Sequence, residues 1–213
     1  MATPTAPGTT ILLIRHGTTP TTGAVLPGRA AGLSLSEAGR AQAEFLAERL
    51  SGLRLAAIYT SPLERARQTA APTAARAGLE PVVDPGLLEC DVGDWTGELL
   101  ADLARRPEWT QVQRSPSTFR FPGGESFVEL QARVGATLDR IRTEHAGQVV
   151  ACFSHADPIR AGLVHALGSG VDAMQRLVVS TGSISAIAYP ADGAPVVLTV
   201  NSVQGALPDL TTR

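Results

Sequence analysis

The chain has 213 residues, of which 44% are hydrophobic and 18% are charged, and it carries a formal net charge of −2 with an isoelectric point near 6.1. This composition is typical of a folded globular protein, and a chain of this length can bury enough surface to be stable without disulfides or metals. The weak net charge excludes a general attraction to nucleic acid or anionic lipid, which depends on clustered Lys and Arg.

The cysteines and the apolar runs indicate a cytoplasmic protein. Cys90 and Cys152 have no CxxC spacing, which argues against a zinc site or a disulfide framework and suits a reducing compartment. The N-terminal sequence has no basic region followed by an apolar core, so we expect no signal peptide. No apolar run is long enough to span a bilayer, so we also expect no membrane association.

The beginning of the chain predicts a strand, a loop, a helix and a second strand. The short apolar run at 11–14 is bounded by polar sequence, as is typical of a buried strand. Residues 17–35 are rich in glycine, proline and hydroxyl residues, which indicates a loop. Ser36 is then placed to cap an amphipathic helix that ends near 51–52, and a second strand is expected at 55–59.

The next helix is predicted from its first two residues. Ser61 supplies a capping hydroxyl and Pro62 suits the first helical position, so we expect a helix from there to about Ala77. The elements expected after it are a strand at 81–84, a loop at 86–96, a short helix near 98–106 and, at 107–124, an excursion over the surface. Three prolines and weak periodicity are the basis for that last expectation.

The rest of the chain completes an α/β pattern. Apolar residues at 127, 130, 134, 138 and 141 recur at helical spacing and predict the clearest amphipathic helix. The elements expected after it are a strand at 149–153, a helix from about 158 to 167, and strands at 184–189 and 195–200. This alternation indicates a three-layer α/β/α sandwich with a mostly parallel central sheet. We expect a single domain over 1–213, with its core at about 9–202 and short flexible tails.

Polar residues follow three of the predicted strands. Arg15 and His16 follow the first, Ser61 and nearby Arg65 follow the second, and His155 follows the fourth. Open α/β sheets bind ligands outside the carboxyl ends of their strands, so these residues can meet in one cationic pocket. A cation in the first turn of a helix opposes the helix dipole unless an anion is close. Phosphate is the anion that suits both arginine forks and helix N-termini.

Five segments carry a resemblance to a known family. They are LLIRHG at 12–17, SPLERARQTA at 61–70, Glu89 followed by GDWTG at 93–97, PGGES at 122–126 and SHADPIR at 154–160. In this order they resemble the histidine phosphatase superfamily, also called phosphoglycerate-mutase-like, and in particular its phosphatase branch. The resemblance extends from about residue 11 to about residue 200.

The resemblance implies a role for each matching residue. His16 would accept the phosphoryl group, which requires a neutral imidazole whose far nitrogen is held by a hydrogen bond. Arg15, Arg65 and His155 would hold the phosphoryl oxygens and stabilise the charge of the transfer. Glu89 would protonate the leaving oxygen and then activate water, a role that needs a raised pKa. No metal or cofactor is implied, because these side chains supply the positive charge.

The chain departs from the pattern of this family beside the expected phosphate site. Thr18 and Thr22 stand where the family usually has Glu or Gln and, a few residues on, Asn. We therefore add Thr22 and Arg29 to the expected phosphate-binding residues. The segment at 122–126 can equally well begin the long helix, so it is left out of the catalytic set.

The expected activity is hydrolysis of a small-molecule phosphate monoester through a phosphohistidine on His16. One alternative is a cofactor-dependent phosphoglycerate mutase; mutases of the family carry a longer insertion with paired basic residues, of which 105–106 is the only counterpart here. Another is a non-catalytic phosphate-binding scaffold. Asp91 and Asp94 compete with Glu89 for the acid role. The substrate and the oligomeric state, a homodimer included, stay open.

Overall fold

The computed structural model describes residues 8–203 and contains a six-stranded sheet. Its strands are β1 (Thr9–Arg15), β2 (Leu55–Thr60), β3 (Val82–Val83), β4 (Val149–Ser154), β5 (Ile184–Tyr189) and β6 (Val196–Ser202). The spatial order is β3-β2-β4-β1-β5-β6; the first four strands are parallel, β5 is antiparallel to β1, and β6 is antiparallel to β5. The predicted fold class is confirmed. The predicted flexible tails lie outside the described residues, apart from one residue at each end.

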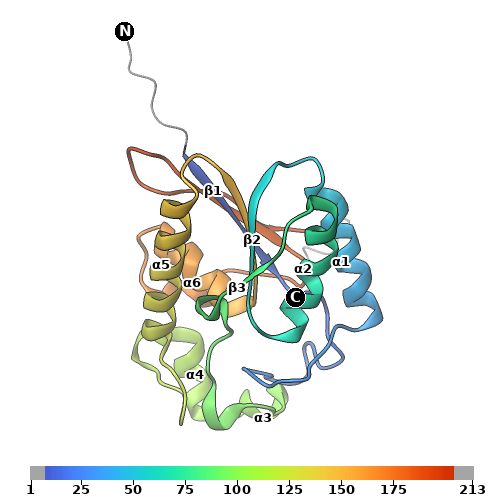
Figure 1. Ribbon diagram of the computed structural model, residues 1–213. Helices are drawn as coiled ribbons and strands as arrows, with labels where there is room; N and C mark the ends of the chain where they lie inside the picture. The colour runs from blue at the N-terminus through green and yellow to red at the C-terminus, as the bar shows by residue number, and fades with distance from the viewer. Residues whose placement is uncertain (1–7, 204–213) are drawn as a thin grey trace.

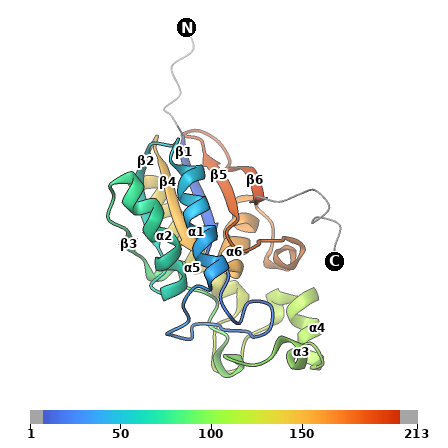
Figure 2. The same ribbon diagram turned by 90° about the vertical axis from the view of Figure 1, so that its right-hand side faces the viewer.

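Helices cover both faces of the sheet and complete the three layers (Figures 1 and 2). They are α1 (Glu37–Leu50) and α2 (Glu64–Ala77) on one face, and α5 (Phe127–Glu144) and α6 (Ala156–Ala166) on the other. Side chains of β1 alternate between two cores: Leu12 and Ile14 pack with Leu46 of α1, whereas Ile11 and Leu13 pack on the side of α5. No helix within residues 8–203 is long and apolar enough to cross a membrane.

Helix α2 begins later than the sequence predicts. Its first residue is Glu64, and its N-cap is Leu63, which makes no side-chain capping bond. The hydroxyl oxygen of Ser61 accepts the N–H of Leu63 at 3.4 Å, before the first helical residue, and it also lies 2.8 Å from Nε2 of His155 on the neighbouring strand end. Arg65 still falls in the first turn of α2, as predicted.

The part of the chain between β3 and α5 is more ordered than the predicted surface excursion. It contains α3 (Leu100–Leu103) and α4 (Pro107–Arg114), which lie beyond the carboxyl ends of the parallel strands (Figure 1). Val112, Phe119 and Phe121 of this part are buried, and both phenylalanine rings pack on Trp95 with centroids 5.4 and 5.3 Å away. The prediction was wrong because apolar anchors at irregular spacing give no periodic signal.

Two glycines allow the start of α1 to contact the residues that follow β1. A Cβ atom on Gly17 would lie 2.5 Å from the carbonyl oxygen of Gly39, and one on Gly39 would lie 2.0 Å from the carbonyl oxygen of Thr18. Ser36, the predicted N-cap of α1, donates its hydroxyl to the same Thr18 carbonyl and accepts the N–H of Gly39. The helix start therefore fixes the backbone on either side of Gly17.

We expect Gly39→Ala to destabilise the protein, because the added methyl group overlaps a backbone oxygen that cannot move aside. Overpacking of this kind costs about 1–3 kcal/mol of unfolding free energy. Gly52→Ala is the matched control, since a Cβ there meets nothing within 4 Å. Urea unfolding of the two variants measures the difference, and equal stabilities would contradict the close contact.

Candidate active site

Three neighbouring parallel strands end at the candidate site. The N–H of His16 donates to the carbonyl of Ser154 at 3.0 Å, and the N–H of Ser61 donates to the carbonyl of Phe153 at 2.9 Å. These bonds extend the sheet by one residue beyond β1 and β2, on either side of β4. The rings of His16 and His155 consequently lie with their centroids 5.1 Å apart.

His16 is held as a neutral imidazole, and its Nε2 has no hydrogen-bond partner among residues 8–203. Its Nδ1 lies 2.7 Å from the carbonyl oxygen of Gly17, and since a carbonyl only accepts, Nδ1 carries the hydrogen. The side chain is 5% exposed. Burial, followed by the charge of Arg15, lowers the pKa of His16 to about 3. The lone pair of Nε2 is therefore available for nucleophilic attack near neutral pH.

His155 is fully buried and is held by two bonds. Its Nδ1 accepts from Nε of Arg65 at 3.3 Å, so its Nε2 carries the hydrogen and donates to the hydroxyl of Ser61 at 2.8 Å. Burial and the neighbouring His16 lower the pKa of His155 well below its usual value. His155 therefore fixes the direction of the Arg65 guanidinium.

Two arginines, Arg65 fully and Arg15 partly buried, each have a buried donor without a partner among residues 8–203. Arg65 is fully buried and donates Nη2 to the carbonyl of Gly28 at 2.7 Å, and Arg15 donates Nη1 to the carbonyl of Val179 at 2.6 Å. Nη1 of Arg65 and Nε of Arg15 are buried without a partner in the part of the chain that the structure describes. Burial lowers the pKa of both guanidinium groups. Buried charged donors without partners are costly, and an anion with several oxygens would satisfy both.

Glu89 supplies a carboxyl group whose pKa is raised to about 7, mainly by burial and then by the nearby charge of Asp157. The N–H of Cys90 and the charges of Arg65 and Arg15 oppose this shift but do not outweigh it. A carboxyl group with this pKa is largely protonated below neutral pH and can donate its proton. Glu89 therefore has the chemistry of a general acid.

The comparisons with known proteins agree with this geometry. Residues 11–202 match the profile of the "Histidine phosphatase superfamily (branch 1)". The chain belongs to the histidine phosphatase superfamily. Within residues 8–203, no group of three or more His, Cys, Asp and Glu side chains is arranged to hold a metal ion.

Several members of the superfamily are similar over much of the chain. A bifunctional protein of Mycobacterium tuberculosis is 36% identical over 211 residues, which cover 93% of this chain and 57% of that protein, so the chain spans little more than half of that relative. Phosphoserine phosphatase 1 of Hydrogenobacter thermophilus is 37% identical over 136 residues, 63% of this chain and 64% of that protein. The structure of a mycobacterial glucosyl-3-phosphoglycerate phosphatase superposes with a TM-score of 0.81 at 26% identity, covering 92% of this chain and 100% of that one.

Thr22 and Arg29, the two residues that were added to the expected phosphate site, bond to other protein groups instead. Thr22 is exposed, and its hydroxyl accepts the N–H of Thr19 at 2.9 Å, which forms a local turn. Arg29 donates Nε to the carbonyl of Glu89 at 2.9 Å, and its other two nitrogens pair with Asp91 and Glu125. Since every guanidinium nitrogen of Arg29 already has a protein partner, this arginine supports the loop of Glu89 and does not extend the cluster formed by the two buried arginines.

Several contacts that build the site could not be predicted from the amino-acid sequence. Ser61 was expected as a helix cap but bonds His155, and Thr69 accepts the N–H of Gly17 at 3.0 Å. The carbonyls of Gly28 and Val179 hold the arginines, and a backbone oxygen has no sequence signature. The sequence did place Ser61 in this pocket, because it directly follows a predicted strand, but it did not indicate the bond to His155.

We expect orthovanadate or phosphate to raise the melting temperature, because either anion would satisfy the unpaired donors of the two buried arginines. An anion at ~100 times its Kd stabilises the folded state by ~2.7 kcal/mol. Arg65→Gln is expected to abolish the response, and Arg67→Gln, an exposed position on the same helix, is expected to keep it. Thermal unfolding with and without the anion provides the measurement. An unchanged response in Arg65→Gln would contradict the assignment of this site.

Proposed function

We propose that the chain is a phosphomonoesterase that hydrolyses a small phosphorylated metabolite through a phosphohistidine. In the first step, Nε2 of His16 attacks phosphorus, the bond from phosphorus to the ester oxygen breaks, and Glu89 gives its proton to that oxygen. In the second step, Glu89 takes a proton from water, the water oxygen attacks phosphorus, and the bond to His16 breaks. Phosphate leaves, and both side chains return to their starting states.

The observation that carries this proposal is the free Nε2 of a neutral, buried His16 beside two buried arginines with unpaired donors. Arg15 and Arg65 can bind the phosphoryl oxygens in the ground state and stabilise the charge of the transfer. His155 completes this clamp by holding Nε of Arg65 in place. Positioning and electrostatics dominate the rate of phosphoryl transfer, so these residues suffice for the chemistry without a metal.

Phosphatase activity is favoured over mutase activity by two further observations. The names of two relatives describe phosphatases, one of phosphoserine and one of glucosyl-3-phosphoglycerate. The paired basic residues of the chain are also occupied: Arg105 pairs with Asp102, and Arg106 pairs with Glu98 and lies over the ring of Trp95. Arg106 therefore already has a carboxylate partner, which disfavours a second role in holding an acidic group of a bisphosphorylated substrate.

We expect the wild type to release phosphate from at least one of O-phosphoserine, 3-phosphoglycerate, glucose 6-phosphate and adenosine 5′-monophosphate. His16→Ala should lose this activity, since the only nucleophile of the proposed mechanism is gone. Inorganic phosphate is measured colorimetrically, and an acid-labile phosphoenzyme trapped in the wild type would exclude a mere binding scaffold. Equal activity of the two proteins, or a wild type inert on all four compounds, would overturn the proposal, whereas faster interconversion of phosphoglycerates than phosphate release would favour a mutase.

The pH profile of kcat/KM should reflect two pKa values. Activity on an alkyl monoester rises as His16 loses its proton near pH 3, and it falls about tenfold per pH unit above about pH 7, where Glu89 loses the proton that it must donate. In Glu89→Gln we expect roughly 10²–10⁴-fold lower kcat/KM and no decline that belongs to this carboxyl group. Ionisation of the substrate affects the wild type and the variant equally. If kcat/KM of the variant still declined above about pH 7, the decline would belong to a group other than Glu89.

A further inference from the structure

The loop that carries Glu89 is held by side chains from distant parts of the chain. Four consecutive carbonyl oxygens, those of residues 86–89, each accept a side-chain hydrogen bond. Arg133 of α5 donates Nη1 to Gly86 at 2.9 Å and to Leu88 at 3.0 Å. The hydroxyl of Ser154 donates to Leu87 at 2.7 Å, and Nε of Arg29 donates to Glu89 at 2.9 Å. The backbone of this loop therefore has little freedom to move relative to the sheet.

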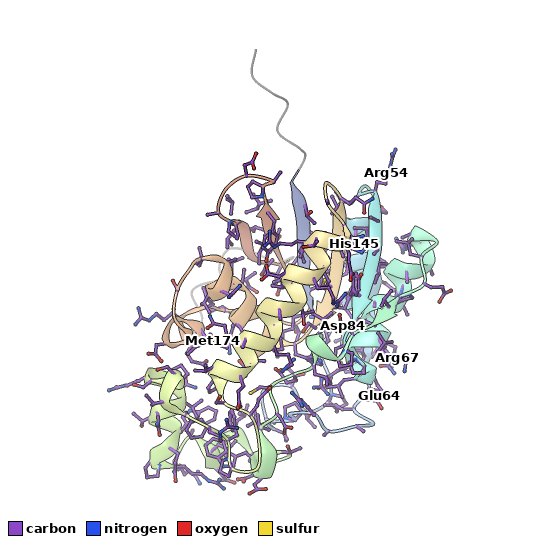
Figure 3. The ribbon with its side chains drawn as sticks, turned by 60° about the vertical axis from the view of Figure 1, so that its left-hand side comes forward. Arg54, Glu64, Arg67, Asp84, His145 and Met174 are labelled. Carbon is purple, nitrogen blue, oxygen red and sulfur yellow. The ribbon has the colours of Figure 1, made fainter. Side chains whose placement is uncertain are left out.

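The start of the same loop is also anchored to α5. Asp84, labelled in Figure 3 between the sheet and α5, accepts the N–H of Gly86 at 2.8 Å and pairs with Arg140 of that helix. His145, the C-cap residue of α5, is labelled at the end of that helix (Figure 3). Arg133 and Arg140 thus connect one face of α5 to the segment leading to Glu89.

Glu125 connects the two arginines that hold the loop. Its Oε1 accepts from Nη2 of Arg133 at 2.7 Å, from Nη2 of Arg29 at 3.1 Å and from the N–H of Asp91 at 3.0 Å. The side chain is only 14% exposed, so these bonds are weakly screened by solvent. The N–H of Glu125 in turn donates to the carbonyl of Asp91 at 2.9 Å. One carboxylate therefore fixes both arginines and the residue two places after Glu89.

A glycine on each of the two segments allows them to approach closely: Gly124 beside Glu125, and Gly93 in the segment that follows Glu89. A Cβ on Gly124 would lie 2.2 Å from the carbonyl oxygen of Asp91, and one on Gly93 would lie 2.0 Å from the carbonyl oxygen of Pro122. Helix α5 does not need this contact, because Ser126 and Glu129 form a complete capping box by themselves. The segment at 122–126 therefore does two things: Ser126 begins the helix, and Glu125 holds the neighbouring loop.

We propose that Glu125, together with Arg29 and Arg133, is a positioning residue for the proton donor. The three side chains form a clamp that sets the distance between the Glu89 carboxyl group and the oxygen of the leaving alcohol. This inference rests on the proposed function, in which Glu89 protonates that oxygen. None of the three residues needs to touch the substrate, and each acts through the backbone of residues 86–91.

Leaving groups of different basicity separate this role from general stability. An alkoxide leaves slowly without a proton, whereas the phenolate of p-nitrophenyl phosphate is a stable anion and leaves without one. A displaced proton donor therefore lowers kcat/KM for an alkyl monoester much more than for p-nitrophenyl phosphate. Partial unfolding would lower both values by the same factor, because it only reduces the concentration of active enzyme.

The experiment compares kcat/KM for p-nitrophenyl phosphate with kcat/KM for the alkyl monoester on which the wild type is most active in the panel above. Glu125→Gln removes the charge that holds both arginines, and we expect a loss of roughly 10²-fold on the alkyl ester with little change on the aryl ester. Arg133→Lys should show the same selectivity, since the single ammonium nitrogen of lysine cannot occupy the positions of both Nη1, which serves the two carbonyls, and Nη2, which serves the carboxylate. Asp139→Asn is the control: it removes an exposed charge of the same helix, which pairs with Arg142, and should not alter the ratio.

Each outcome has a distinct meaning. Glu89→Gln must itself show the selective loss on the alkyl ester; if it does not, the proposed role of Glu89 fails. If Glu89→Gln shows the loss but Glu125→Gln and Arg133→Lys lower both substrates equally or not at all, the clamp is refuted while the proposed function survives. A selective loss in Asp139→Asn would also refute the clamp, because that carboxylate pairs with Arg142 and not with any residue of the clamp.

Discussion

The constraint on which the site depends is the burial of two cationic side chains that have no carboxylate in contact. Arg65 is fully buried and Arg15 is partly buried, and burial lowers the pKa of both because it disfavours the charged form. Buried charges in proteins are normally paired. Here the carbonyls of Gly28 and Val179 satisfy part of each guanidinium, and Nη1 of Arg65 and Nε of Arg15 are left without a partner among residues 8–203. The protein side of the site is therefore complete only when an anion with several oxygens binds.

This constraint explains why loops distant in sequence converge on the ends of the strands. The loop that precedes α1 supplies the Gly28 carbonyl to one arginine, and the segment before β5 supplies the Val179 carbonyl to the other. The loop that carries Glu89 is held by other arginines. One of them is Arg29, which donates to the backbone carbonyl of Glu89. The arginines of the site thus divide into two groups: those with free donors, which can bind phosphate, and those with every nitrogen engaged, which hold the backbone.

The sequence predicts the first group well and the second group poorly. Arg15, His16 and His155 follow apolar runs that end at one edge of a parallel sheet, so strand order alone brings them together. Arg29 gives no such signal, because a loop arginine can face phosphate or a carbonyl with equal ease. Glu125 was hidden by its neighbour Ser126, which accounts for the local sequence as a helix cap. Contacts between two loops depend on the path of the backbone, which composition and periodicity do not encode.

The same reasoning applies to the two errors in secondary structure. The hydroxyl of Ser61 was assigned to the helix start alone, but it accepts the N–H of Leu63, which precedes the helix, and also bonds a buried histidine on an adjacent strand end. The segment at 107–124 folds against Trp95 through Val112, Phe119 and Phe121. In both places a tertiary contact decided the structure and the local pattern did not.

Burial has opposite effects on the two groups that would move the phosphoryl group and the proton. It lowers the pKa of His16 to about 3 and raises the pKa of Glu89 to about 7, because in each case it favours the neutral form. The nucleophile must be neutral to attack and the acid must be neutral to donate, so a single physical effect prepares both. Their working range is the interval between these two pKa values. The positive charge of Arg15 and Arg65 strengthens the first shift and opposes the second, so the raised pKa of Glu89 depends on its burial and on Asp157. If the loop moved into solvent, the pKa of Glu89 would fall and its carboxyl group would lose its proton at neutral pH. Holding the loop in place is therefore necessary for proton donation.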